Sequence, residues 1–128
     1  MVVWYFEDEA TPELDALLVV VRDADAIVPV IWHFEIVNVL LMAERRQRIS
    51  ATAATNYLHL LSTLPIATED ADGERVRRDV LPLARAHRLT VYDAAWLELA
   101  VRLSIPLATT DRALLTAARA VGAGVLPA

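Results

Sequence analysis

The chain has 128 residues, of which 56% are hydrophobic and 23% are charged, and its formal net charge is −5. This length suits one domain with its own core, and the composition excludes a disordered chain. The negative charge argues against nucleic-acid binding by bulk positive charge, but it is compatible with a carboxylate cluster that binds a metal ion.

The absence of cysteine excludes disulfides, thiolate chemistry and cysteine-ligated zinc. The N-terminus lacks the basic segment of a signal peptide, and acidic residues begin at Glu7. No apolar run approaches the ~18 residues of a membrane span. These features predict a cytoplasmic protein with no membrane contact.

The first half of the chain contains three helical patterns and one short strand. Thr11 and Pro12 are typical of an N-cap and a first helical position, and they predict a helix in TPELDALLVVVRD. A strand over residues 26–29 precedes a long helix from about Ile31 to Arg46, which is apolar on nearly all sides and is therefore expected to be buried. Ser50 is the predicted cap of a third helix, which ends near residue 64.

The second half alternates short apolar strands with helices. The predicted strands are PIAT (65–68), PLATT (106–110) and the final GVLP, and the predicted helices cover 72–88 with a break at Pro82, 90–104 and 111–122. Alternation of this kind predicts parallel βαβ units in a three-layer α/β/α fold. Ligands of such sheets bind beyond the carboxyl ends of the strands.

Three acidic residues are expected near the carboxyl ends of predicted strands, where ligands would bind. Glu35 is inside the apolar helix IWHFEIVNVLLM, where an ionised carboxylate is costly unless it is paired or bound to a metal. Asp93 and Asp111 each begin a helical segment, so either one could instead be an ordinary N-cap. Taken together, the three predict an oxygen-ligand site for Mg²⁺, which could activate water for phosphodiester hydrolysis.

Other common catalytic patterns are absent from the sequence. The three glycines form no phosphate-binding loop, which argues against nucleoside triphosphate and dinucleotide enzymes. The histidines have no zinc-binding spacing, and no serine lies in a G-x-S-x-G elbow. Zinc and serine hydrolases are therefore not expected.

Two stretches resemble a known family. PVIWHFEIVNVLLMAERRQRIS and LTVYDAAWLELAVRLSIPLATTDRALLTAARAVGAGVL, in this order, are similar to the PIN-domain ribonuclease toxins of the VapC type. The resemblance covers nearly the whole chain. It implies a PIN-like α/β/α domain with a short parallel sheet, and endonucleolytic RNA cleavage that depends on Mg²⁺ or Mn²⁺. It also implies a cognate antitoxin protein as partner, and a homodimer.

The same resemblance assigns roles to the acidic residues. Asp93 would ligate the metal directly, while Glu35 and Asp111 would complete the metal-binding cluster and orient the attacking water. Thr109 and Asn38 would be supporting residues. Arg45, Arg46 and Arg112 could contact the RNA backbone. For Arg45 and Arg46, the favoured interpretation is the basic end of a helix that complements its dipole.

The start of the chain departs from the family pattern. In the family, a first strand in the middle of the sheet ends in an Asp-Ala-Ser-like turn, and that aspartate binds metal. We interpret VVWYFEDE as the helix that follows this turn, with Glu7, Asp8 and Glu9 at the surface. The prediction is therefore a single domain over 1–128 without the first strand and the first acid, whose true start lies upstream of Met1.

Two alternatives to an active ribonuclease remain at this stage. With three acids instead of four, the chain could be a catalytically impaired relative that acts by binding an antitoxin-like partner. A third and less favoured hypothesis is a phosphate-handling domain of another family, such as a phosphatase, although such enzymes usually keep a nucleophilic aspartate after the first strand.

Overall fold

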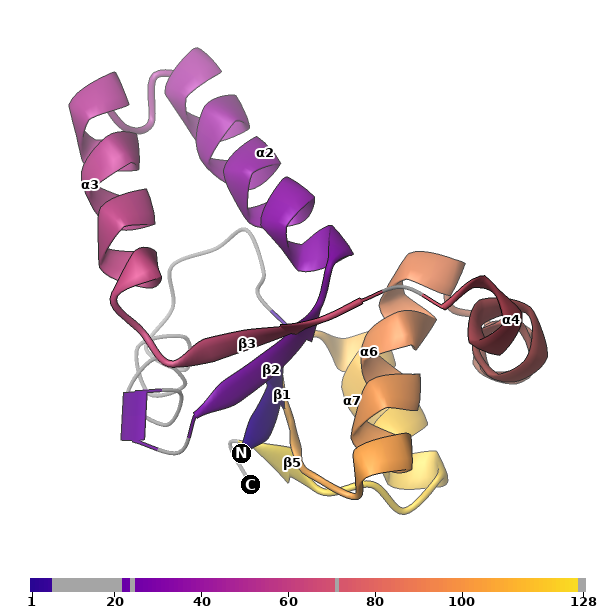
Figure 1. The fold of residues 1–128 in the computed structure, drawn as a ribbon. Coiled ribbons are helices and arrows are strands. Elements are labelled where there is room, and N and C mark those ends of the chain that lie inside the picture. Colours follow the sequence, from indigo (N-terminus) through magenta and orange to yellow (C-terminus); the bar gives the residue numbers. More distant parts are fainter. Residues whose placement is uncertain (6–21, 24, 71, 127–128) are drawn as a thin grey trace.

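The sheet of the protein contains five parallel strands in the order β3-β2-β1-β4-β5. The computed structural model describes residues 1–5, 22–23, 25–70 and 72–126 (Figure 1). The strands are β1 (Val2–Trp4), β2 (Ala26–Pro29), β3 (Ile66–Glu69), β4 (Leu107–Ala108) and β5 (Val125–Leu126). The strands predicted over 26–29, 65–68, 106–110 and the final GVLP are confirmed within one or two residues.

The opening residues correct the sequence prediction. Val2–Trp4 is the central strand of the sheet, so the first strand is present and VVW does not begin a helix. Val3 pairs with Ile27 of β2 on one side and with Leu107 of β4 on the other. Both neighbouring strands therefore have β1 as the partner of their backbone groups. The predicted helix from Thr11 and the residues Glu7, Asp8 and Glu9 lie outside the described residues.

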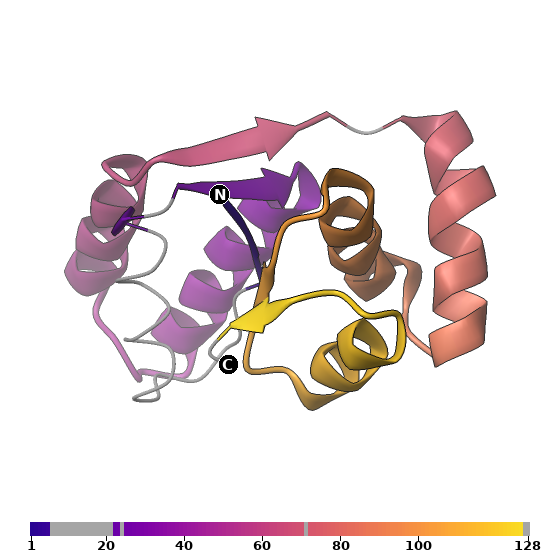
Figure 2. The same ribbon diagram turned by 90° about the horizontal axis from the view of Figure 1, so that it is seen from below.

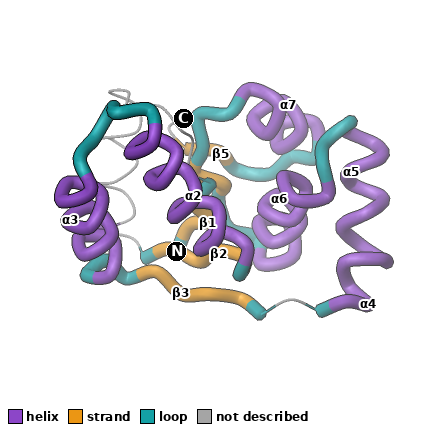
Figure 3. Tube along the Cα trace, turned by 90° about the horizontal axis from the view of Figure 1, so that it is seen from above, coloured by secondary structure: helices purple, strands orange, loops and turns teal. Residues whose placement is uncertain are grey.

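Helices cover both faces of the sheet. Their bounds are α2 (Ile31–Arg45), α3 (Ala51–Ser62), α4 (Gly73–Arg75), the π-helical turn η1 (Val76–Val80), α5 (Leu81–His87), α6 (Val91–Leu103) and α7 (Arg112–Ala120). In Figures 2 and 3, α2 and α3 lie on one side of the strands, and α6 and α7 lie on the other. This follows from the strand order, because right-handed crossovers from β2 to β3 and from β4 to β5 run in opposite directions along the sheet. The predicted three-layer α/β/α architecture is confirmed.

Local signals explain where several helices begin. The Ser50 side chain accepts a hydrogen bond from the amide of Ala53 at 3.0 Å, as expected for the cap of α3. The break expected near Pro82 takes the form of η1, after which Pro82 occupies the first turn of α5. A proline is tolerated at this position because the first amides of a helix have no intrahelical partner.

The core is built around three tryptophans from three elements. Trp4 of β1 and Trp96 of α6 are fully buried, and Trp32 of α2 is nearly so. The ring centroids of Trp4 and Trp32 are 5.7 Å apart, and the Trp96 indole donates a hydrogen bond of 3.0 Å to the carbonyl of Trp4. The central strand is thereby held from both faces.

Within the described ranges, no helix has both the length and the apolar character needed to cross a bilayer.

Candidate functional site

The topology places a crevice at the carboxyl ends of β1 and β4. The chain progresses from β1 through β2 to β3 in one direction along the sheet, and from β4 to β5 in the other. The crossovers on the two sides of this switch point cover opposite faces, and ligands of such sheets bind beyond the strand ends at this point, in the region that we call the crevice. The residues that follow these two strands are Tyr5 and Thr109, and helices α2, α6 and α7 all begin at this edge.

Tyr5 lies at the centre of the crevice. Its amide donates to the carbonyl of Ala108 at 3.0 Å, which fixes the backbone just beyond β1. Its phenol donates a hydrogen bond of 3.1 Å to Oδ1 of Asp93, 88 residues further along the chain. Burial, and then the charge and hydrogen bond of Asp93, raise the pKa of the phenol well above its usual range. Asp111 and Glu35 add to this effect, so all three predicted acids are in electrostatic range of one phenol.

Glu35 reaches the crevice from α2. This helix begins only one residue after β2 ends, which places its second turn near the edge of the sheet (Figure 1). The carboxyl of Glu35 is half-buried, and its pKa is raised first by burial and then by the charge of Asp93. Glu35 and Asp93 therefore repel each other across the crevice when both are ionised.

Asp93 is not the cap of its helix. The cap of α6 is Thr90, whose hydroxyl accepts a hydrogen bond from the amide of Asp93 at 3.1 Å. The Asp93 carboxylate faces Tyr5 instead. Burial and the charge of Asp111 raise its pKa, against the lowering effect of the Tyr5 hydrogen bond. The helix-cap explanation that the sequence left open for Asp93 therefore does not apply.

Asp111 does have a structural role. It is the N-cap of α7, and its Oδ1 accepts a hydrogen bond from the amide of Leu114 at 2.8 Å. The fully buried Thr109 holds the preceding backbone, because its hydroxyl accepts from the amide of Asp111 at 3.0 Å. One carboxylate oxygen of Asp111 is therefore occupied by the helix.

No basic side chain compensates these acids. In the part of the chain that the structure describes, none of the ion pairs involves Glu35, Asp93 or Asp111. The residues outside the described ranges contain no arginine, lysine or histidine, so they cannot supply a cation either. Three carboxylates without a cationic partner are the electrostatic setting in which a bound metal ion is favourable.

The donor set suits an open metal site better than a closed one. Among the described residues, no three histidine, aspartate or glutamate side chains are placed to ligate one ion. Mg²⁺ is usually bound by one or two carboxylates together with water and substrate phosphates. Asp93 with Glu35 or with Asp111 would provide such a pair, and the chemistry supplied by the ion would be activation of water and stabilisation of phosphate charge.

The remaining predicted residues lie further from the crevice. Asn38 is exposed on α2, about one turn beyond Glu35. Arg45 and Arg46 are exposed at the far end of the same helix, about 15 Å from Glu35 at the helical rise of 1.5 Å per residue. Arg112 is exposed at the start of α7, directly after Asp111. Of the three arginines, Arg112 is the one beside the acids.

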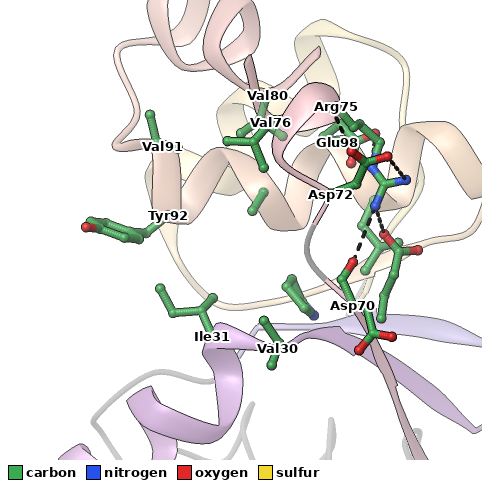
Figure 4. A pocket seen from close by; sticks show the side chains of 14 residues that line it. Val30, Ile31, Asp70, Asp72, Arg75, Val76, Val80, Val91, Tyr92 and Glu98 are labelled. Atoms are coloured by element: carbon green, nitrogen blue, oxygen red, sulfur yellow. Dashed lines mark hydrogen bonds and ion pairs between the residues drawn. The ribbon is translucent and has the colours of Figure 1, made fainter. Parts of the chain in front are cut away.

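An apolar cavity of about 260 Å³ lies next to the acids but is not formed by them. Its apolar wall includes Val30, Val76 and Tyr92 (Figure 4). The lining also includes Arg75 and Glu98, which belong to a network of ion pairs. None of the three predicted acids lines this cavity.

Sequence reasoning missed the role of Tyr5. It placed Tyr5 in a helix, VVWYFEDE, but Tyr5 directly follows the central strand. Reading VVW as a fully buried strand of three residues would have placed Tyr5 at a carboxyl end of the sheet, where ligand sites occur.

Comparisons with known proteins give the fold and not the family. No protein-family model and no curated protein matches the chain. PAE2754 from Pyrobaculum aerophilum is similar in structure, with a TM-score of 0.71 and 22% identity over 98% of this chain and 83% of that one. FitAcB from Neisseria gonorrhoeae is similar with a TM-score of 0.60 and 16% identity, over 98% of this chain and 96% of that one. These likenesses establish a PIN-like three-layer α/β/α fold, as the sequence resemblance predicted.

Proposed function

We propose that the protein is a metal-dependent endoribonuclease, the toxin of a toxin–antitoxin pair, and that it hydrolyses RNA phosphodiester bonds with Mg²⁺ or Mn²⁺. Asp93 would be the principal ligand of the ion. Glu35 and Asp111 would complete the acidic cluster and orient water, with Thr109 positioning Asp111 and with Asn38 as a further supporting residue. The PIN-like fold and the ordered sequence motifs are what connect this site to RNA cleavage.

The observation that carries the proposal is the uncompensated acid cluster at the switch point of the sheet. Glu35, Asp93 and Asp111 all act on the phenol of Tyr5, and burial and repulsion between acids raise the pKa values of Glu35 and Asp93. A chain that needed these residues only for stability would be expected to pair them with arginine, as it does with Glu98. Such perturbed groups in a crevice are typical of functional sites.

RNA backbone contacts are proposed for Arg112, Arg45 and Arg46. Arg112 begins α7 beside the cluster, so it is best placed to contact a phosphate next to the cleaved bond. Arg45 and Arg46 would contact the strand further away, because they lie at the other end of α2. Their contribution would be electrostatic and salt-dependent.

The partner surface that we propose is the exposed face of α2. Phe34, Val37 and Leu41 are 75%, 48% and 36% exposed, and their spacing places them on one side of the helix. Apolar side chains in such a row are typical of protein contacts.

We propose that this face takes part in binding an antitoxin or in homodimer formation. Sedimentation or light scattering should give twice the mass of the chain, and Phe34→Ser should reduce that mass if α2 forms the dimer contact.

The test of the nuclease proposal is RNA cleavage by the purified chain with Mg²⁺ or Mn²⁺ and with EDTA. We expect cleavage that requires the ion and falls about 100-fold or more in Asp93→Asn. Asp23→Asn is the matched control, because Asp23 precedes β2 and therefore lies at the opposite edge of the sheet. Equal cleavage by the wild type and Asp93→Asn would contradict the proposal.

A second candidate function is binding without catalysis. The observation in its favour is Tyr5, a neutral side chain after the central strand, where the resembled family has a fourth carboxylate. In this case the chain would act through its antitoxin-like partner alone. The purified wild type would then cleave RNA no faster than Asp93→Asn at any concentration of Mg²⁺ or Mn²⁺, although both proteins are folded.

A further inference from the structure

Tyr5 occupies the most central position that a side chain can have in this crevice. It follows β1, which is the middle strand of five, and its amide is hydrogen-bonded to Ala108 at the end of the neighbouring β4. The side chain therefore leaves the backbone at the switch point itself. Its phenol is hydrogen-bonded to Asp93 of α6, and it is within electrostatic range of Glu35 of α2 and of Asp111, the N-cap of α7.

Two contacts orient the side chain of Tyr5. Its ring packs edge-on against Trp96, with ring centroids 5.1 Å apart and an angle of 81° between the planes. Trp96 is itself fully buried and hydrogen-bonded to the carbonyl of Trp4. The phenol is thereby directed toward Asp93, and the 3.1 Å hydrogen bond occupies Oδ1 of that carboxylate.

This arrangement has two consequences for a cation. The phenol contributes a proton donor at a place where a carboxylate would contribute a negative charge and two ligand oxygens. It also uses an oxygen of Asp93 that a hard divalent ion would otherwise approach. Both effects lower the affinity of the site for a cation without changing Glu35 or Asp111.

We propose that Tyr5 is a positioning residue that takes the place of a metal-ligating carboxylate, holds Asp93 by its phenol, and keeps the divalent-cation affinity of the RNA-free protein low. This inference rests on the proposed function, because it concerns the ion at the same site. It makes a separate claim, however, since cation affinity can be measured without RNA and without catalysis.

The experiment measures Mn²⁺ affinity by titrating the folded full chain with Mn²⁺. Calorimetry monitors the heat of binding, and electron paramagnetic resonance monitors the free ion. Tyr5→Asp adds a carboxylate at the end of β1, and we expect it to tighten Mn²⁺ binding about tenfold or more. Tyr5→Phe keeps the ring but frees Asp93, and we expect about threefold tighter binding. Tyr92→Asp is the matched control, because it adds the same charge to an exposed tyrosine beside Asp93. The Mn²⁺ affinity of Tyr92→Asp should stay within about twofold of that of the wild type.

Two further measurements separate an effect of Tyr5 through Asp93 from an effect of the substitution on folding. In an Asp93→Asn background, Tyr5→Phe should no longer change Mn²⁺ affinity, since the phenol acts through Asp93. Circular dichroism melting would show whether Tyr5→Asp is folded, and Tyr5→Phe provides the test if it is not. Wild-type affinity equal to or tighter than that of Tyr5→Phe would overturn the inference, even if the wild type cleaves RNA. Tighter binding by Tyr5→Phe without RNA cleavage by any variant would support the inference and count against the nuclease proposal.

Discussion

Helix α6 carries two acidic regions that differ in how their charge is balanced. Near its start, Asp93 faces a phenol and two further acids, and it has no basic partner among the described residues. Five residues later, Glu98 is only 6% exposed, and its carboxylate accepts from Arg102 at 2.7 Å and lies 3.9 Å from Arg75. The same helix therefore contains a compensated and an uncompensated acid.

The compensated region joins separate parts of the fold. Arg75 reaches Glu69 at 2.9 Å, and Arg102 also pairs with Glu69, the last residue of β3. These contacts connect the edge strand, α4 and α6, and Figure 4 shows Arg75 and Glu98 together beside the apolar cavity. Buried acids that serve stability are thus paired with arginine in this chain. Acids left without such partners point to a function, which is what the following predictions test.

The largest expected loss of stability is in Glu98→Gln. This change removes the charge that compensates Arg75 and Arg102, and it should lower the free energy of unfolding by about 2 kcal/mol. Urea unfolding would measure it. Glu74→Gln is the matched control, since Glu74 also pairs with an arginine four residues on but is exposed. That control should cost less than about 0.5 kcal/mol, and an equal cost for both would remove the distinction between the two regions.

A smaller loss of stability is expected at Asp111, which is both the N-cap of α7 and a proposed site residue. Asp111→Ala removes the acceptor of the Leu114 amide and should cost about 1 kcal/mol of unfolding free energy. Asp111→Asn retains the cap and should cost almost nothing, yet both variants should lose RNA cleavage. If Asp111→Asn cleaves RNA as fast as the wild type, and only the less stable Asp111→Ala is impaired, then Asp111 is only a helix cap.

The smallest effect is a gain in stability in Glu35→Gln. Because the folded-state pKa of Glu35 lies above its ordinary value of 4.5, the carboxyl reduces stability as the pH rises through that folded-state pKa. Below about pH 4.5 both states are protonated and the penalty is absent. The variant should therefore melt above the wild type at pH 7 and at the same temperature near pH 4. A gain independent of pH would contradict this electrostatic origin.

The sequence predicted most of the fold because most elements carry strong local signals. The apolar periodicity around Trp32 and the Ser50 cap define α2 and α3 within a few residues. The central strand was missed because Val2–Trp4 is buried on both faces and is only three residues long. A run of this length has no periodicity that distinguishes a strand from a helix start.

Glu35, Asp93 and Asp111 stay predicted site residues, and the sequence does not indicate how they are organised. Expected burial and position along the chain were the grounds on which these three residues were selected. The sequence could not show which aspartate caps a helix, because Thr90 and Asp111 both satisfy the preference for an N-cap. Nor could it show the contact between Tyr5 and Asp93, which joins residues 88 positions apart and depends on the tertiary fold.

The central claim is that the uncompensated acids serve function and the compensated acid serves stability. The most direct test measures RNA cleavage per folded molecule and unfolding free energy for the same two variants, Asp93→Asn and Glu98→Gln. We predict that Asp93→Asn loses cleavage while its stability is unchanged or slightly higher, and that Glu98→Gln loses stability while it retains cleavage. Cleavage by Asp93→Asn at the wild-type rate, or a loss of stability in Asp93→Asn as large as that in Glu98→Gln, would contradict the account.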